Sequence, residues 1–187
     1  MMLVRTVLLL LALGSPGVPA YAWSLPELQG LLQAQPARVL AFEEVRESPW
    51  LAAPRTSRGT LRASAQGLEK HVTEPRAETW RLLGDRMEWV GAEGQPARTL
   101  RYAEAPAVAA LARALRLAVA GDLGALQSDF HIELGGNASL WSARLNPRRP
   151  EVARSLDHLE LQGAQGRLQV IIVHERSGER TTTRLLH

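Results

Sequence analysis

Cysteine is absent from this 187-residue chain. No disulfide can form, no thiolate can bind a metal, and no lipid can be attached through an N-terminal cysteine. Lysine is nearly missing as well, because Lys70 is the single lysine beside twenty-one arginines. The arginines are scattered, and Arg148-Arg149 is the only adjacent pair. Nucleic-acid-binding surfaces concentrate basic residues on one face, so a nucleic-acid partner is not expected.

The longest apolar run lies at the N-terminus. Arg5 precedes an unbroken apolar run from Val7 to Leu13, and Ala20-Tyr21-Ala22 has the small residues of a cleavage site. The run is too short to span a bilayer, so residues 1–22 are predicted to be a secretory signal peptide cleaved near Ala22. Residues 23–187 are long enough for one domain with its own core. We expect this domain to be exported, soluble and monomeric.

Strand patterns dominate the first hundred residues. In the run Val39–Arg46, Phe42, Glu44 and Arg46 share one face, because side chains two apart in a strand point the same way. Alternating runs joined by turn residues predict an antiparallel meander. Its further strands are expected at Gly59–Ala65, Leu68–Val72 and Arg98–Tyr102.

The clearest hairpin lies between Ala77 and Val90. Its loop is predicted at Gly84-Asp85, because this type of dipeptide favours two-residue hairpin loops. The alternation places Trp80 and Leu82 on one strand face, and Met87 and Trp89 on one face of the partner strand.

Two segments have helical periodicity. Ser24 to Glu27 forms a capping-box pattern with proline near the helix start. The apolar face that follows is Leu25, Leu28, Leu31 and Leu32. Pro106 to Ala120 is rich in alanine, which favours helix, and places Val108, Leu111, Leu115 and Val119 at helical spacing. Each of these amphipathic helices needs an apolar surface to cover.

Strand alternation returns in the last third of the chain. Strands are predicted from Phe130 to Leu134, from Leu140 to Leu145, around Leu159 and Leu161, and over Leu168–Glu175 and Arg180–Leu186. Gln169–Val173 is apolar at nearly every position, which predicts a strand covered on both faces. With about ten strands and two or three non-alternating helices, the predicted fold is mainly β (α+β).

No catalytic or metal-binding motif is found. The five histidines lack metal-ligand spacing, and His131 with Glu133 is interpreted as an exposed strand edge. There is no glycine-rich phosphate loop and no Gly-x-Ser-x-Gly elbow. We expect no enzyme, no metal and no cofactor; a catalytic carboxylate assembled in three dimensions is the open alternative.

Surplus apolar surface is the remaining feature. Trp80, Trp89 and Trp141 belong to a predicted sheet that two leucine-rich helices can cover. Such a sheet either closes on a filled core or leaves a ligand cavity, and the pattern alone leaves both possibilities open.

Several short motifs follow one another along the chain. The first are Phe42-x-Glu44-x-Arg46, Leu51-x-x-Pro54, Ser57-x-Gly59-x-Leu61 and Leu68-x-Lys70 with Pro75. The later ones are Gly84-Asp85, Gly121-Asp122 with Leu126 and Phe130, Trp141-x-x-x-Leu145-x-Pro147, and His174 to Glu179. In order and spacing they resemble the LolA family of periplasmic lipoprotein carriers. They look most like its divergent branch associated with aryl polyene or similar lipid biosynthesis.

The resemblance implies an incomplete antiparallel β-barrel with helices as a lid over a hydrophobic cavity. The cavity would hold acyl chains of a lipoprotein or other lipid, and the protein would move this cargo through the periplasm toward the outer membrane. An inner-membrane donor complex and an outer-membrane acceptor are the implied partners. The lid would be Leu28, Leu31, Leu32, Leu111 and Leu115. The wall would be Leu61, Trp80, Leu82, Met87, Trp89, Leu134, Trp141 and Leu145.

One departure from the family pattern leaves the cargo open. Where the family often has an Arg-Pro pair, with the arginine tied to lid closure, this chain has Ala65-Gln66. The alternatives are an accessory enzyme acting on a lipid or polyene precursor, and a non-transporting scaffold or sensor. The enzyme predicts an acid or base inside the cavity, and the scaffold predicts a filled core.

Overall fold

The computed structural model describes residues 23–34, 39–92 and 95–187, so the predicted signal peptide lies outside the described residues. The helices are α1 (Leu25–Gln33), α2 (Pro106–Ala120) and α3 (Pro150–Ala153), with short 3-10 turns η1 (Tyr102–Glu104) and η2 (Gly124–Ser128). The strands are β1 (Val39–Glu47), β2 (Arg55–Ser64), β3 (Gly67–Glu74), β4 (Glu78–Leu82), β5 (Arg86–Val90), β6 (Arg98–Arg101), β7 (Phe130–Gly136), β8 (Trp141–Pro147), β9 (Leu156–Ala164), β10 (Arg167–Glu175) and β11 (Arg180–Leu186).

All eleven strands form one antiparallel sheet in the order β6-β5-β4-β3-β2-β1-β11-β10-β9-β8-β7. The first and last strands of the chain therefore pair in the middle of the sheet, where Phe42 lies opposite Leu185. The two ends of the sheet, β6 and β7, are joined by α2 and do not pair with each other among the described residues. This confirms the predicted open, antiparallel, mainly β fold, with one strand more than the approximate count.

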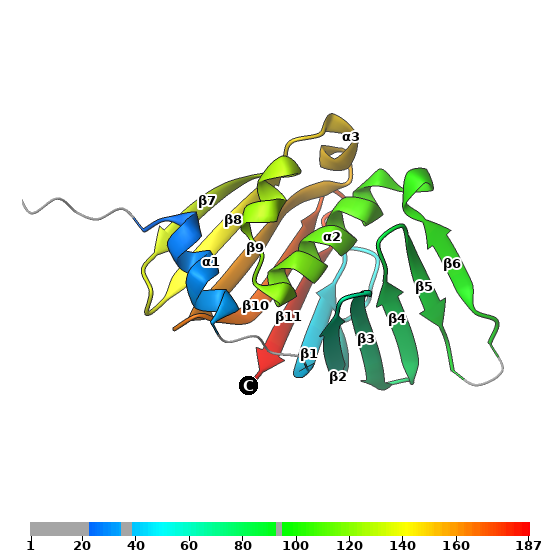
Figure 1. The fold of residues 1–187 in the computed structure, drawn as a ribbon. Coiled ribbons are helices and arrows are strands. Elements are labelled where there is room, and N and C mark those ends of the chain that lie inside the picture. Colours follow the sequence, from blue (N-terminus) through cyan, green and yellow to red (C-terminus); the bar gives the residue numbers. More distant parts are fainter. Residues whose placement is uncertain (1–22, 35–38, 93–94) are drawn as a thin grey trace, which may run out of the picture.

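Both longer helices lie on one side of the curved sheet, which we call the inner face (Figure 1). Leu28 and Leu32 of α1 are buried, as are five residues of α2: Ala110, Ala112, Ala114, Ala118 and Val119. No described helix has the length and hydropathy that a membrane span requires.

The helix ends follow from local chemistry. The Glu27 carboxylate accepts hydrogen bonds from the backbone N–H and the hydroxyl of Ser24, at 2.9 and 2.7 Å. Gly121 ends α2 in the left-handed conformation, φ +77°, which glycine adopts without steric cost.

The inner face is a filled core under α1 and the adjoining part of the sheet. Trp141, Phe130, Leu145 and Leu159 are among the largest fully buried side chains. Trp141 lies opposite Gly163 in the register, and its ring occupies the space where a side chain at Gly163 would project. The absence of a side chain at residue 163 therefore makes room for the indole.

The prediction that Gln169–Val173 is covered on both faces is wrong. Ile171 and Val173 are buried in the core, whereas Val170 and Ile172 are only half-buried on the other side of the sheet. We call this other side the outer face. On that side their cross-strand partners are polar, with Gln162 and Arg184 opposite Val170 and Glu160 and Thr182 opposite Ile172.

Candidate ligand-binding cleft

Trp80 of β4 and Trp89 of β5 belong to the half of the sheet that lies away from α1 (Figure 1). The two-residue hairpin loop forms as predicted, with the Leu83 N–H donating to the Arg86 carbonyl at 2.9 Å. It sets Trp80 directly opposite Trp89. The ring centroids are 6.0 Å apart and the planes are tilted by 51°, within the range of favourable aromatic pairs.

One carboxylate holds both indoles. Trp80 Nε1–H donates to Glu78 Oε1 at 3.0 Å, and Trp89 Nε1–H donates to Oε2 at 2.9 Å. The Arg98 guanidinium lies 5.3 Å from the centre of the Trp89 ring, on its face. These contacts fix the orientation of the two indole rings.

A hollow of about 360 Å³ opens beside the two indoles. Its size is within the usual range of small-molecule sites. Burial decreases along β4 toward it, from Leu82, which is buried, to Trp80, which is half-buried. The residues that line it are Glu78, Trp80, Met87, Trp89, Arg98, Thr99 and Leu100.

A second, more polar hollow of about 590 Å³ shares Glu78 with the first. It carries three arginines, which are Arg46, Arg55 and Arg76. The other lining residues are Glu44, Thr56, Ser57, Val72, Pro75 and Glu78. Together the two hollows form a cleft with an apolar end at the tryptophans and a cationic end at the arginines.

Three of the motif residues join the cleft to the centre of the sheet. Phe42 is buried beneath Lys70, whose Nζ lies 5.0 Å from the ring centre. Glu44 accepts a hydrogen bond from Lys70 Nζ at 2.6 Å and from the Thr183 hydroxyl at 2.8 Å. These contacts tie β1 to its neighbour β11 and to β3.

Arg46 is fixed by a carboxylate on the closing hairpin. Its Nε and Nη2 lie 2.7 and 2.8 Å from the two carboxylate oxygens of Glu179, a bidentate pair. Hydrogen bonding to Glu179 raises the pKa of Arg46 above its ordinary value. The guanidinium is therefore a permanent cation at the wall of the second hollow.

The other two motif residues shape the backbone. Gly59 lies at the register shift between β2 and β3, where an added side chain would collide with the backbone of His71 and Val72. Pro54 is exposed just before β2 begins. Ala65-Gln66 occupies the turn between β2 and β3, where the Gln66 N–H donates to the Ser64 hydroxyl at 3.3 Å.

The structure divides the residues predicted to touch lipid into two groups. Trp80, Met87 and Trp89 line the first hollow. The group that belongs to the buried core is Leu28, Leu32, Leu61, Leu82, Trp141 and Leu145. Both outcomes left open by the sequence thus occur in one sheet, a filled core in one half and a hollow in the other.

The remaining predicted residues lie between these groups. Leu111, Leu115 and Leu134 are partly buried and pack against the core. Leu31 lies at the exposed edge of α1, 36% exposed, against the turn at Gly166.

Glu78, Arg98 and Leu100 line the cleft but are missing from the prediction. Glu78 lies two residues before Trp80, so strand parity places the two on the same face. The positions of Arg98 and Leu100 in the cleft follow from the register between β6 and β5, which places them opposite Trp89 and Met87. Alternation alone does not specify this register.

The architecture and the cleft define a class: an open antiparallel half-barrel, partly covered by helices, with an amphipathic hollow on its inner face. The profile of the family described as "Outer membrane lipoprotein carrier protein LolA-like" matches residues 23–186. The chain belongs to this family. The match begins directly after the predicted signal peptide.

Solved structures with a similar fold come from several bacteria. A LolA superfamily protein, NE2245, from Nitrosomonas europaea is 14% identical with a TM-score of 0.45, covering 87% of this chain and 90% of that one. A putative outer membrane lipoprotein-sorting protein domain from Vibrio parahaemolyticus is 6% identical, TM-score 0.43, covering 87% and 89%. A DUF1329 family protein from Desulfovibrio piger is 9% identical, TM-score 0.44, covering 89% and 92%. No curated protein matches the chain.

Proposed function

We propose that this protein is a periplasmic carrier that binds the acyl chains of a lipoprotein or another lipid in the cleft and moves them toward the outer membrane. The observation that carries the proposal is the apolar wall of Trp80, Met87, Trp89 and Leu100 beside an open hollow. Each methylene removed from water gains about 0.8 kcal/mol. About ten methylenes against this wall therefore gain about 8 kcal/mol before the costs of association.

The arginines give the cleft a preferred head group. Arg46, Arg55 and Arg76 line the second hollow with Glu44 and Glu78. Both carboxylates already accept hydrogen bonds from protein donors, Glu44 from Lys70 and Glu78 from the two indoles. Guanidinium groups bind carboxylates and phosphates in a bidentate manner. Glu179 already holds Arg46 in a bidentate pair, so Arg55 and Arg76 are the guanidinium groups offered to a ligand. The favoured cargo is thus an amphiphile with its chain at the tryptophans and an anionic group at Arg55 and Arg76.

The test is binding of a fluorescent fatty acid to tag-free protein comprising residues 23–187. Met87→Lys places an ammonium group on the apolar wall, which we expect to weaken binding by about tenfold or more because the charge loses water when the chain enters. Val90→Lys is the matched control, since Val90 is a partly buried apolar residue on the outer face of the same strand. Lipid extracted from protein purified from its native envelope would be identified by mass spectrometry.

Two results would overturn the proposal. One is the absence of lipid in the purified protein together with no uptake of the fatty acid. The other is an equal loss of affinity in Met87→Lys and Val90→Lys, because the fatty acid would then not bind specifically at the cleft.

A further inference from the structure

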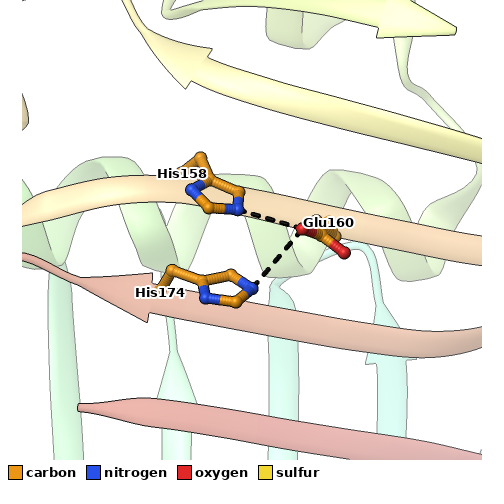
Figure 2. Close-up of side chains that lie close together, drawn as sticks. All are labelled: His158, Glu160 and His174. Atoms are coloured by element: carbon orange, nitrogen blue, oxygen red, sulfur yellow. Dashed lines mark hydrogen bonds and ion pairs between the residues drawn. The ribbon is translucent and has the colours of Figure 1, made fainter. Parts of the chain in front are cut away.

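Two histidines and a glutamate meet on the outer face of the sheet, away from the cleft. His158 and Glu160 are two apart on β9, and His174 lies directly opposite His158 on β10 (Figure 2). Their neighbours in sequence, Leu159, Ile171 and Val173, point to the core instead. Strand alternation therefore gathers the three polar side chains on one surface.

The potential ligand atoms converge. His158 Nε2 lies 3.0 Å and His174 Nε2 lies 3.5 Å from the same Glu160 Oε1, as Figure 2 shows. One donor atom from each residue can be chosen so that all three lie within 4.8 Å of one another. Donors in a tetrahedral zinc site, with bonds of 2.0–2.2 Å, are about 3.3 Å apart. The spacing is already close to that of a metal centre.

Hydrogen bonding orients His158 as it would a ligand. Its Nδ1 lies 2.8 Å from Asp157 Oδ2. A carboxylate accepts, so Nδ1 carries the hydrogen and the lone pair of the neutral ring is at Nε2. A carboxylate behind a ligating imidazole is the usual support of a metal-bound histidine. In this neutral tautomer the lone pair faces Glu160 Oε1, another acceptor, at 3.0 Å. Either a proton on Nε2, which then donates to Glu160, or a metal ion between the two atoms makes the contact favourable.

His174 has an unsatisfied atom at the same point. Its Nε2 is buried and has no hydrogen-bond partner among the described residues, although the Glu160 oxygen is within ion-pair distance. Burial is the largest cause that lowers the pKa of His174, which favours the neutral ring that metals bind. A buried polar atom without a partner is costly, and a bound ion would remove that cost.

We propose that His158 Nε2, His174 Nε2 and a Glu160 carboxylate oxygen bind a divalent first-row transition-metal ion of the zinc type, with Asp157 as a positioning residue. Imidazole and carboxylate donors suit such ions. Three protein donors leave a fourth position for water or for a ligand from another molecule.

Closure on an ion requires a small rotation of the rings. The two imidazoles are stacked, with centroids 4.1 Å apart and planes 14° from parallel. Lone pairs lie in the ring planes, so the planes must converge before both can reach one ion. His158 is buried and held by Asp157, so the rotation falls on His174 and Glu160, which are partly exposed. The terminal torsion of histidine is broadly distributed, which permits this movement.

Nearby arginines set the strength of the site. Arg144 Nη1 lies 3.8 Å from Glu160 Oε1. Arg176 Nη1 pairs with Asp157 at 2.7 Å, and Arg180, which pairs with Glu47, also acts on His174. These cations oppose a metal ion. Arg144→Gln should therefore bind zinc several-fold more tightly.

The experiment is titration of tag-free, metal-free protein comprising residues 23–187 with Zn²⁺ against a chromophoric competitor. We expect one ion per chain, and an intense d–d absorption with Co²⁺ that indicates four-coordination. His158→Gln and His174→Gln should lose at least about tenfold in affinity, and Asp157→Asn on the order of tenfold. His131→Gln is the control, because His131 forms a similar but exposed pair with Glu133, 3.9 Å apart, on β7.

The proposal fails if Zn²⁺ does not bind at one equivalent. It also fails if His131→Gln weakens binding as much as His174→Gln does. Far-ultraviolet circular dichroism of the metal-free variants verifies that they are folded, and the Co²⁺ spectrum of the unsubstituted protein is a test that needs no variant. Fatty-acid uptake is measured separately, so neither outcome depends on the carrier function.

Discussion

Substitution of Glu78 by glutamine tests how the apolar end of the cleft is built. Both carboxylate oxygens accept an indole N–H, from Trp80 at 3.0 Å and from Trp89 at 2.9 Å. Glutamine has nearly the same shape but replaces one acceptor with an NH₂ donor, so one indole N–H is left facing another donor. Hydrogen bonds to charged groups contribute about 1.5–3 kcal/mol. Because all three side chains are partly exposed, we expect a loss of about 1–2 kcal/mol.

The measurement is urea unfolding followed by far-ultraviolet circular dichroism, because tryptophan fluorescence changes with the substitution itself. A loss of 1 kcal/mol corresponds to about 2–4 °C in the midpoint of thermal unfolding for a domain of this size. Glu88→Gln is the matched control on the next strand. Its carboxylate pairs with Arg86 at 2.8 Å on the solvated outer face, and exposed pairs contribute about 0–1 kcal/mol.

A second background isolates the indole contact. In Trp89→Phe one donor is gone, and the glutamine carbonyl can accept from the remaining donor, Trp80. The cost of Glu78→Gln should therefore be smaller in Trp89→Phe than in the unsubstituted protein, a coupling that a double-mutant cycle measures. The reasoning is refuted if Glu78→Gln costs no more than Glu88→Gln, or if its cost is unchanged when Trp89 is phenylalanine.

Three further predictions concern other parts of the molecule. Tyr102 is the single tyrosine in residues 23–187, and burial raises the pKa of its hydroxyl, which has no hydrogen-bond partner among the described residues. Its absorbance titration should have a midpoint above about 10. Stability should fall as the pH rises beyond that value, because the unfolded chain loses this proton first. Trp141→Ala should lower the free energy of unfolding by about 3–5 kcal/mol, whereas Trp50→Ala, at a residue that is 82% exposed, should change it by less than about 0.5 kcal/mol; urea unfolding measures both. Lys70→Met should destabilise the protein by about 1–2 kcal/mol, since it leaves the half-buried Glu44 carboxylate without its cation. Adding Glu44→Gln should recover part of that loss in the same assay. A double variant no more stable than Lys70→Met alone would contradict this.

Local sequence chemistry was sufficient to predict several elements. The Gly84-Asp85 dipeptide predicted the hairpin, and strand parity predicted which residues share each face. The structure adds that Trp80 lies opposite Trp89, a register that follows from the two-residue loop. The alanine-rich segment predicted α2, and its end at Gly121 follows from the left-handed conformation there. These features depend on neighbours within a few residues of one another.

Features that depend on register far from a turn were not predictable. With the β9–β10 turn at Gln165-Gly166, simple pairing would place Val173 opposite His158. A bulge between Leu168 and Val170 shifts the register by one residue, so His174 takes that place. One extra residue moves a side chain to the other face, and histidine spacing in the sequence therefore gave no sign of the cluster.

The division between core and cleft was also beyond the pattern. Leu82 and Trp80 share a face and a strand, and α2 contacts that strand, yet only Leu82 is buried. Alternation identifies which face a residue occupies, but not how far along that face a covering helix extends. The position of that helix depends on the connection between the two edge strands, because α2 lies between β6 and β7 in the chain.

The pairing of β1 with β11 has a consequence for the order in which the molecule is completed. Arg180 of β11 bonds to Glu47 of β1 across 133 residues of sequence. The strand that unites the two halves is the last of the eleven to be synthesised, and pairings over such separations are slow to form. Until it docks, β1 and β10 both present open edges that can pair with other chains. The second hollow has β1 as a wall, and Thr183 of β11 holds Glu44 there. We therefore expect the second hollow to be completed only when β11 docks, at the same step that removes the two open edges.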